Sequence, residues 1–429
     1  MHKDHHIEIH EVTRVEGHGN IVVDVKNGAV KEVRLEIIES PRFFEALIKG
    51  RHYKEVPHII SRICGICSSS HTCASLKAVE DALGMKLSKR ARLLRELTLC
   101  AETIQSHILH LYFLVLPDFM GTHSVLPILK DNPSLMEPGL KLKSLANQIS
   151  TVLNGRPVHP IALFPGGTLH IPEKKELCKL KEHLEEATGL IRRAWETFCG
   201  FSTPEYEKVR EFISLKPSSG YSMYDGTPFS SIDGPIEKEN FASWLEEYVV
   251  AHSTAKHAKT PHGTYMVGAL ARLNNNYRRL KPLAKGLLKE APFSVPCHIP
   301  FMNNLAQIIE CMHLAEYAIE LIDRLLSMGL EKEPLARPTR YGRGTGIVEA
   351  PRGILYHSYT INNDGTIEAA NCIIPTAQNL RSIEDDLRGL VPELLPCSRE
   401  EIVKGVEGLV RAYDPCISCS THIMDVEFV

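Results

Sequence analysis

Four of the twelve cysteines form two Cys-x-x-Cys pairs, one near each end of the chain. The first pair is Cys64 and Cys67, and the second is Cys416 and Cys419. Two cysteines three residues apart around a tight turn can direct both sulfurs toward one point, and Gly65 lets the backbone of the first pair fold closely. Four thiolates favour zinc or an iron–sulfur centre on coordination chemistry alone.

The long separation between the two pairs differs from that of a common zinc ribbon, in which the pairs lie about 15–20 residues apart. Joining such distant segments predicts a site that lies deep between the two ends of the chain. A zinc ion that merely holds the two ends together remains an alternative on spacing alone.

The sequence around the pairs resembles the nickel-binding signatures of [NiFe]-hydrogenase large subunits, with Arg-x-Cys-Gly-x-Cys near the start and Asp-Pro-Cys-x-x-Cys-x-x-His near the end. Further blocks of the family follow in the family's order, and they are residues 14–18, 42–45, 155–160, 165–167, 349–353 and 374–376. The resemblance therefore extends from about residue 7 to the end of the chain. Local sequence around these blocks is similar to the cytoplasmic bidirectional branch, which includes archaeal sulfhydrogenases.

This resemblance implies a nickel–iron centre on the four cysteines. Cys64 and Cys416 would be terminal ligands of nickel, and Cys67 and Cys419 would bridge nickel to an iron that carries CO and cyanide. His71 would hydrogen-bond to a bridging sulfur, since outer groups of this kind orient and tune a metal site.

The resemblance also implies which residues surround the iron. Pro351, Arg352 and Thr376 would lie around the diatomic ligands, with Asp414 beside the arginine. Many relatives have an aspartate where this chain has Ser106, so a carboxylate near Arg352 is expected to be missing.

Heterolytic cleavage of dihydrogen needs a hydride acceptor and a base within a few ångströms of each other. The metals would accept the hydride, and the thiolate of Cys416 is the expected base. Glu16 is the next expected proton carrier toward solvent, although an exposed, ion-paired carboxylate is the alternative for it. Arg352 is always charged, which makes it an electrostatic anchor rather than a free base.

A magnesium ion, or sometimes iron, is implied near the C-terminus, held by Glu45, the backbone carbonyl of Cys372 and His422. Carboxylate and carbonyl oxygens suit magnesium, whereas an imidazole is less typical. A helix-surface role for Glu45 competes with this assignment. Residues 423–429 follow the final histidine and resemble the tail that a maturation protease removes after nickel-insertion factors have delivered the metal.

The remaining eight cysteines share no short spacing that could hold a relay cluster. An iron–sulfur small subunit is therefore the expected electron partner, with further subunits binding flavin and NAD(P) or a deazaflavin. A dihydrogen sensor shares the ligands but generally lacks a cleavable tail. The nickel-free quinone-module homologue of respiratory complex I has lost the cysteines that this chain keeps.

Net charge is -3, from 49 basic and 52 acidic residues that are well mixed, so neither nucleic acid nor an anionic membrane is an expected partner. The N-terminus lacks the apolar core of a secretory signal. We find no apolar run of the roughly 20 residues that a membrane span needs. Cytoplasm is the expected location.

The elements that must position these residues are predicted to be mainly α-helical, within a single domain over residues 1–429. Alternating patterns around turn residues predict β-hairpins at 21–37 and 355–374. Helices are predicted at 75–83, 88–116, 138–154, 173–198, 240–251, 302–328 and 399–412, several with an N-cap serine such as Ser88 or Ser398. Loops rich in Gly and Pro are predicted at 156–172, 216–235 and 337–353.

Overall fold

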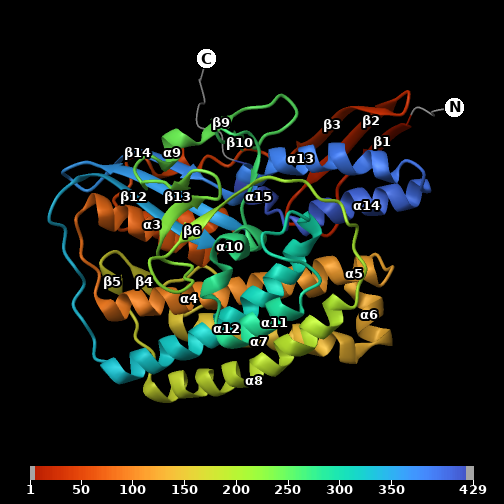
Figure 1. The fold of residues 1–429 in the computed structure, drawn as a ribbon. Coiled ribbons are helices and arrows are strands. Elements are labelled where there is room, and N and C mark those ends of the chain that lie inside the picture. Colours follow the sequence, from red (N-terminus) through yellow and green to blue (C-terminus); the bar gives the residue numbers. More distant parts are fainter. Residues whose placement is uncertain (1–4, 422–429) are drawn as a thin grey trace.

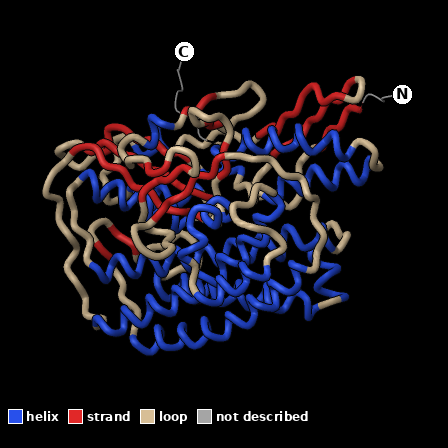
Figure 2. The backbone as a smooth tube through the Cα atoms, in the orientation of Figure 1, coloured by secondary structure: helices blue, strands red, loops and turns tan. Residues whose placement is uncertain are grey.

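Long helices fill one side of the molecule and small sheets cover the other, as Figure 1 and Figure 2 show. The computed structural model describes residues 5–421. This arrangement confirms the predicted class, a mainly helical body with small β elements near both ends of the sequence.

Four long helices make up the helical side and pack against one another. They are α4 (Lys89–Leu109), α7 (Pro133–Asn154), α8 (Lys174–Cys199) and α12 (Asn303–Met328). α8 is amphipathic: it starts with a capping box of Glu173 and Glu176, and Leu177, Leu180 and Leu184 are buried at helical spacing. α8 therefore forms the outer layer of this side.

α4 is instead a core helix, buried almost all round. Ser88 caps it as predicted, because its hydroxyl accepts the N–H of Ala91 at 3.1 Å. The helix continues through the π-helical turn η2 (His110–Val115) into α5 (Leu116–Phe119). The combined segment Lys89–Phe119 is long and apolar enough to cross a membrane by length and composition, but 83% of its apolar window is buried inside the protein. Its apolar character is thus explained by burial in the core.

The strands form small separate sheets. The antiparallel sheet near the N-terminus contains β1 (His5–Ile9), β2 (Gly19–Lys26) and β3 (Ala29–Ile37). A second antiparallel sheet contains β12 (Gly342–Ala350), β13 (Gly353–Ile361) and β14 (Ile367–Ile373). The remaining strands are β4 (Leu163–Phe164), β5 (Gly167–Thr168), β6 (Glu211–Lys216), β7 (Thr227–Ser230), β8 (Gly234–Pro235), β9 (Glu246–Tyr248), β10 (His257–Lys259) and β11 (Tyr265–Met266).

Shorter helices connect these layers. They are α1 (Phe44–Ile48), α2 (Val56–Ile60), η1 (Ser61–Ile63), α3 (Ser68–Ala82), α6 (Val125–Asp131), α9 (Phe241–Trp244), α10 (Ala269–Asn276), η3 (Tyr277–Arg279), α11 (Pro282–Glu290), η4 (Pro300–Met302), α13 (Pro375–Leu394), α14 (Arg399–Ala412) and α15 (Ile417–Ser420). α13 packs on β3, α14 and α15, so it joins the N-terminal sheet to the last helices of the chain.

Both predicted hairpins and most of the predicted helices are present, but several elements differ from the prediction. The helix predicted at 240–251 is wrong: α9 ends at Trp244, and the following residues form β9, which pairs with β10. The loop predicted at 337–353 contains the strand β12, and no helix was predicted for α13. α3 begins at Ser68 rather than at residue 75, so it starts directly after the first cysteine pair.

Candidate metal centre

The first cysteine pair lies between η1 and α3, in a turn that fixes one sulfur. The Sγ atom of Cys64 accepts the backbone N–H of Ile66 at 3.2 Å and of Cys67 at 3.0 Å. Because two backbone N–H groups of the turn donate to this sulfur, the turn itself orients Cys64, independently of a bound metal.

The second pair lies in the segment that leads into α15, and this segment runs beside residue 16 near the N-terminus. A parallel bridge pairs Glu16 with Cys416, and the N–H of Ile417 donates to the Glu16 carbonyl at 2.8 Å. The N–H of Cys416 donates to the hydroxyl of Thr376, at the start of α13, at 2.9 Å. The two ends of the chain are therefore joined at this point.

The four sulfurs meet in one buried cluster, as the spacing argument predicts. The Sγ atoms of Cys64 and Cys416 are 3.6 Å apart, and those of Cys67 and Cys419 are also 3.6 Å apart. The Sγ atoms of Cys416 and Cys419 are 2.8 Å apart, and all four lie within 4.8 Å of one another. None of the four side chains is more than 5% exposed.

The electrostatics of the cluster favour one thiolate among neutral thiols. Burial alone would raise the pKa of Cys64, but hydrogen bonds from the other three thiols hold it well below its usual value. Burial raises the pKa of Cys416 and of Cys419 well above the usual value. Four thiolates this close together therefore need a positive charge among them, which a bound metal dication supplies.

Arg352 is buried beside the cluster and is held by two partners. Its Nε and Nη2 donate to the carbonyl and the carboxylate of Asp414, both at 2.7 Å, and its Nη1 donates to the hydroxyl of Ser106 at 3.2 Å. Burial alone would lower the pKa of Arg352, but Asp414 and the cysteine sulfurs raise it well above its usual value. Ser106 therefore contacts Arg352 at the position where the sequence analysis noted that many relatives have an aspartate.

Glu16 lies against the second pair and is half-buried. Its Oε2 atom accepts the thiol of Cys416 at 3.1 Å and the backbone N–H of Ser418 at 3.1 Å. The hydroxyl of Ser418 donates to Glu39 at 3.3 Å. Glu16 is half-buried against the second pair, which differs from the exposed, ion-paired carboxylate of the alternative.

Three other predicted residues, His71, Cys372 and Glu45, have contacts within the described part of the chain. Nδ1 of His71, which was expected to bond to a bridging sulfur, is 3.2 Å from Nε2 of His357, and His357 pairs across β13 and β14 with Cys372. Glu45 is buried in α1, and its Oε1 accepts the N–H of Cys372 at 3.2 Å. His422 lies outside the described residues.

Two residues that sequence reasoning did not single out hold the first pair in place. Glu102, on α4, accepts the N–H of Ser69 at 2.5 Å and of Ser70 at 2.7 Å, and so caps the start of α3. Arg42 donates to the carbonyls of Ile63 at 2.7 Å and Arg62 at 2.9 Å. The backbone N–H of Arg42 also donates to Thr421 at 2.7 Å, so this residue ties both cysteine segments together.

Arg42 stands in one of the family blocks, which is a weak signal for it. Glu102 is one of several charged side chains buried in α4, so nothing in the sequence marked it out. Carboxylates are seldom fully buried unless they are paired, so such a residue indicates a specific partner.

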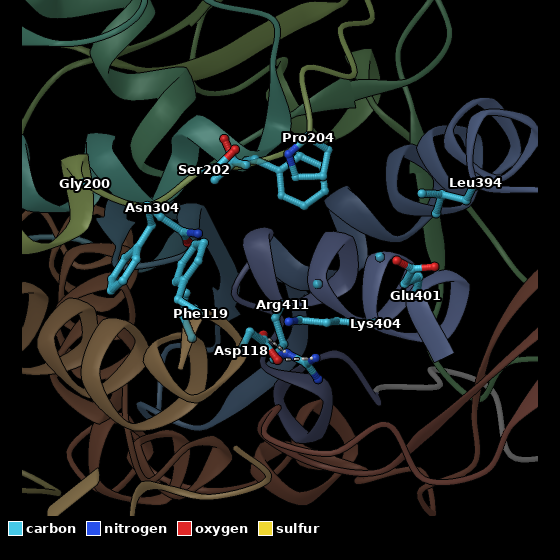
Figure 3. A pocket seen from close by; sticks show the side chains of 16 residues that line it. Asp118, Phe119, Gly200, Ser202, Pro204, Asn304, Leu394, Glu401, Lys404 and Arg411 are labelled. Atoms are coloured by element: carbon cyan, nitrogen blue, oxygen red, sulfur yellow. Dashed lines mark hydrogen bonds and ion pairs between the residues drawn. The ribbon is translucent and has the colours of Figure 1, made fainter. Parts of the chain in front are cut away.

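A large cavity of about 490 Å³ lies elsewhere, between α5, α14 and the segment 200–204. In Figure 3, Asp118 and Arg411 face each other at one wall and are joined by an ion pair of 2.6 Å. None of the four cysteines lines this cavity.

The cluster fits a metal of the transition series. Buried sulfurs from both chain ends converge without forming disulfides, and thiolates are the ligands that such metals prefer. A structural zinc ion would fit the same four sulfurs on coordination chemistry alone.

The family comparison decides between these metals. The family model described as nickel-dependent hydrogenase matches residues 42–137 and 206–422, and a model described as HoxL-like matches residues 6–40. The chain is 38% identical over 419 residues to sulfhydrogenase 2 subunit alpha of Pyrococcus furiosus, which covers 97% of this chain and 99% of the relative. It is also 28% identical over 468 residues to the NAD-reducing hydrogenase HoxS subunit beta of Cupriavidus necator, covering 97% and 94%.

Solved structures agree with this result. An NAD+-reducing [NiFe]-hydrogenase in the H2-reduced state has a TM-score of 0.90 and 29% identity, over 97% of this chain and 99% of that chain. A Ni-Fe-Se hydrogenase from Desulfovibrio vulgaris Hildenborough, with a TM-score of 0.76 and 24% identity over 98% and 100%, shares the fold.

The chain belongs to the nickel-dependent hydrogenase family, which supports a nickel–iron centre, and its cysteine cluster is compatible with one. Within that family it is a catalytic large subunit, an oxidoreductase that acts on dihydrogen, similar to the alpha subunits of heteromeric sulfhydrogenases.

Proposed function

We propose that this subunit cleaves dihydrogen at a metal pair held by Cys64, Cys67, Cys416 and Cys419, and that the proton leaves through Cys416 and Glu16. The main support is one observation: the thiol of Cys416 lies 3.1 Å from the Glu16 carboxylate inside a cluster of four buried sulfurs. A base and a metal site are thereby placed within direct reach of each other.

The pairing of the sulfurs supports the division into terminal and bridging ligands. The first cysteines of the two pairs, Cys64 and Cys416, are neighbours, and so are the second ones, Cys67 and Cys419. We assign the first set to nickel alone and the second to the bridge between nickel and iron. When bound, the metal pair supplies the hydride acceptor and the start of the electron path.

We assign the pocket around the iron, with its CO and cyanide ligands, to Pro351, Arg352 and Thr376. Thr376 accepts the Cys416 N–H, so its hydroxyl hydrogen can donate to a cyanide nitrogen. The carbonyl of Pro351 accepts Nη2 of Arg272 at 2.8 Å, which fixes the backbone before Arg352. The cationic Arg352 offsets the negative charge of thiolates and cyanide.

The proton route uses groups whose positions are already set. The N–H of Ser418 holds the Glu16 oxygen that faces the Cys416 sulfur. From Glu16 the proton continues toward Glu39, which lies on the other side of Ser418 and accepts its hydroxyl. The first transfer, from Cys416 to Glu16, joins groups within hydrogen-bond reach.

We retain a magnesium or iron site formed by Glu45, the carbonyl of Cys372 and His422. It is supported by the contact between the buried Glu45 carboxylate and the backbone of Cys372. A carboxylate facing a strand backbone offers the oxygen ligands that magnesium prefers.

Electrons from this site need another protein, because within residues 5–421 the other eight cysteines form no group of metal-ligating side chains. We assign this role to an iron–sulfur small subunit in the cytoplasm, with further subunits that bind flavin and NAD(P) or a deazaflavin. We also retain residues 1–429 as one domain whose residues 423–429 are removed by a protease after nickel-insertion factors have acted.

Elemental analysis joined to infrared spectroscopy of the purified complex tests the metal assignment. Nickel and iron together, with bands of iron-bound CO and cyanide, are the expected result. Zinc alone would identify a structural zinc site that holds the two chain ends together, and it would refute the proposal. Turnover of dihydrogen then separates an enzyme from a sensor.

Intact-mass measurement tests the maturation step separately. The active subunit is expected to lack the mass of residues 423–429. An active, nickel-containing subunit that retains this mass would contradict tail removal without affecting the metal assignment.

A further inference from the structure

A second group of metal-ligating side chains lies apart from the cysteines, where the β9–β10 hairpin meets α13. It contains His252, His257 and Glu384, whose ligand atoms lie within 4.8 Å of one another. The segment between β9 and β10 carries His252, β10 begins with His257, and Glu384 stands on α13. We propose that these three residues bind a divalent transition-metal ion, with zinc as the metal that suits them best.

The unusual member of this group is His257. Its side chain is fully buried, and neither ring nitrogen has a hydrogen-bond partner among residues 5–421. An imidazole has at least one N–H donor and one acceptor or second donor, and burying both without partners is costly. A metal ion bound to one nitrogen removes part of this cost.

The carboxylate of Glu384 lies between the two imidazoles. Its Oε1 is 2.7 Å from Nε2 of His252, and its Oε2 is 4.0 Å from Nδ1 of His257. Metal–nitrogen and metal–oxygen bonds of about 2.0–2.2 Å need ligand atoms some 3–4 Å apart. Small movements of these side chains therefore suffice to place one ion among the three.

The local backbone already holds the three residues in position. The N–H of Leu35, on β3, donates to Glu384 Oε1 at 3.0 Å, and the N–H of Thr254 donates to the carbonyl of Ile37 at 3.0 Å. The hairpin, β3 and α13 are thus already in contact around the group. An ion here would join three elements that are far apart in sequence.

One cation competes for the same carboxylate. Nη1 of Arg381 lies 3.3 Å from Glu384 Oε2, and its Nη2 lies 3.5 Å from Asp385. The Arg381 side chain is 39% exposed, so it can keep Asp385 as a partner and leave Glu384 when an ion binds.

The donor types select the metal. Two imidazoles and one carboxylate suit zinc and its neighbours, whereas calcium and magnesium prefer oxygen ligands. Three protein ligands leave a fourth position for water, and His252, whose side chain is 23% exposed, is the side open to solvent.

The test uses the purified, nickel-loaded complex, in which the cysteines are already occupied. Zinc chloride is added, loosely bound metal is removed by dialysis, and the zinc that remains is measured together with nickel. Wild-type protein is expected to retain a stoichiometric amount, and His257→Phe and Glu384→Gln are expected to fall to background. A double variant, His6→Asn with His10→Asn, is the matched control, because these exposed histidines could hold zinc adventitiously; it should retain zinc like the wild type.

X-ray absorption at the zinc edge identifies the ligands. Nitrogen and oxygen neighbours at about 2.0–2.1 Å are expected, without sulfur at about 2.3 Å. Sulfur neighbours, or undiminished zinc in a nickel-loaded His257→Phe protein, would overturn the proposal, and a water molecule would then be the partner of His257. If His257→Phe does not fold, His252→Asn decides, because this residue is partly exposed: loss of zinc supports the site and retention refutes it.

Discussion

The two cysteine pairs are held in different ways. The first pair precedes α3, a largely buried helix, and its surroundings include a buried carboxylate, Glu102, that caps this helix. The second pair lies at the short helix α15, with Cys416 at its N-cap and Cys419 inside it, and hydrogen bonds from its backbone to Glu16 and Thr376 hold it. One half of the centre therefore belongs to the core, whereas the other half is a terminal segment laid against it.

This difference implies that the two halves contribute differently to folding stability and to proton transfer. The half built into the core contributes to folding stability as well as to metal binding. The terminal half is held by hydrogen bonds to Glu16, Thr376 and Arg42, and it carries the contact to Glu16, the proposed proton acceptor. Substitutions in the two halves should accordingly have different effects on stability, metal content and proton exchange.

The largest effect is expected from Cys67→Ser. A serine hydroxyl is too weakly acidic to replace a bridging thiolate, so activity should be abolished and the metal pair should not be inserted. Nickel and iron content of the purified subunit measures this effect. A Cys73→Ser variant, which changes a buried cysteine outside the cluster, is the control and should keep both metals.

Glu16→Gln should act on the proton route alone. An amide keeps the shape of the side chain but cannot carry a proton, and a positioned acid–base group typically contributes about 10²–10⁴-fold. Exchange of dihydrogen with solvent deuterons should slow by a factor in this range while nickel content stays normal. Unchanged exchange would remove Glu16 from the route.

Glu102 predicts a pH dependence of folding stability. Burial raises its pKa from 4.5 to about 7, despite hydrogen bonds from Ser70 and Ser69. The folded chain then binds this proton more tightly than the unfolded chain, so stability is highest below the unfolded pKa. It falls as pH rises from about 4.5 to about 7, by on the order of 3 kcal/mol.

Denaturant unfolding of the wild type and of Glu102→Gln, at pH values on either side of this window, measures the slope. The amide mimics the protonated acid, so the variant should lose this part of the pH dependence. An equal slope in both proteins would assign the dependence to other groups.

The smallest effect is expected from Thr376→Val, which changes a residue of α13 that holds the terminal half. It leaves the buried N–H of Cys416 without its acceptor, which costs about 1–3 kcal/mol. The cost should appear as weaker retention of nickel during dialysis against a chelator, with little change in global unfolding. Thr376→Ser keeps the hydroxyl and should behave like the wild type. A large drop in unfolding stability for Thr376→Val would remove the distinction between the two halves.

Local sequence patterns correctly predicted several helices. α8 and α14 combine an apolar stripe at helical spacing with polar flanks, whereas the first half of α12 is buried on all sides. All three helices begin and end within a residue or two of the predicted bounds. α13 carries the same pattern, with buried Ala377, Leu380 and Ile383, and Pro375 at its first position is a favourable helix start. No helix was nevertheless predicted there.

Tertiary contacts decided where the prediction failed. The apolar pattern at 240–251 predicted a helix, but pairing with β10 makes part of it a strand. In β12, Gly344 and Gly346 suggested a loop, yet a Cβ atom at either position would lie 2.1 Å from the backbone of α3. These glycines allow a strand and a helix to pack backbone to backbone, which no local pattern reveals.

The candidate centre shows the same limit. The cysteine spacing and the surrounding blocks predicted that four sulfurs meet, and they do meet in the structure. The contacts of Arg42 and Glu102 depend on how the elements around the first pair pack, so beyond the family block that contains Arg42 the sequence contained no signal for them.

The parallel bridge between Glu16 and Cys416 makes neighbours of residues 400 positions apart in sequence, which the ribosome adds at widely separated times. A growing chain exposes its first two sulfurs long before their counterparts have been made. A chain that stops before Cys416 therefore lacks two of the four sulfurs and cannot form the complete cluster.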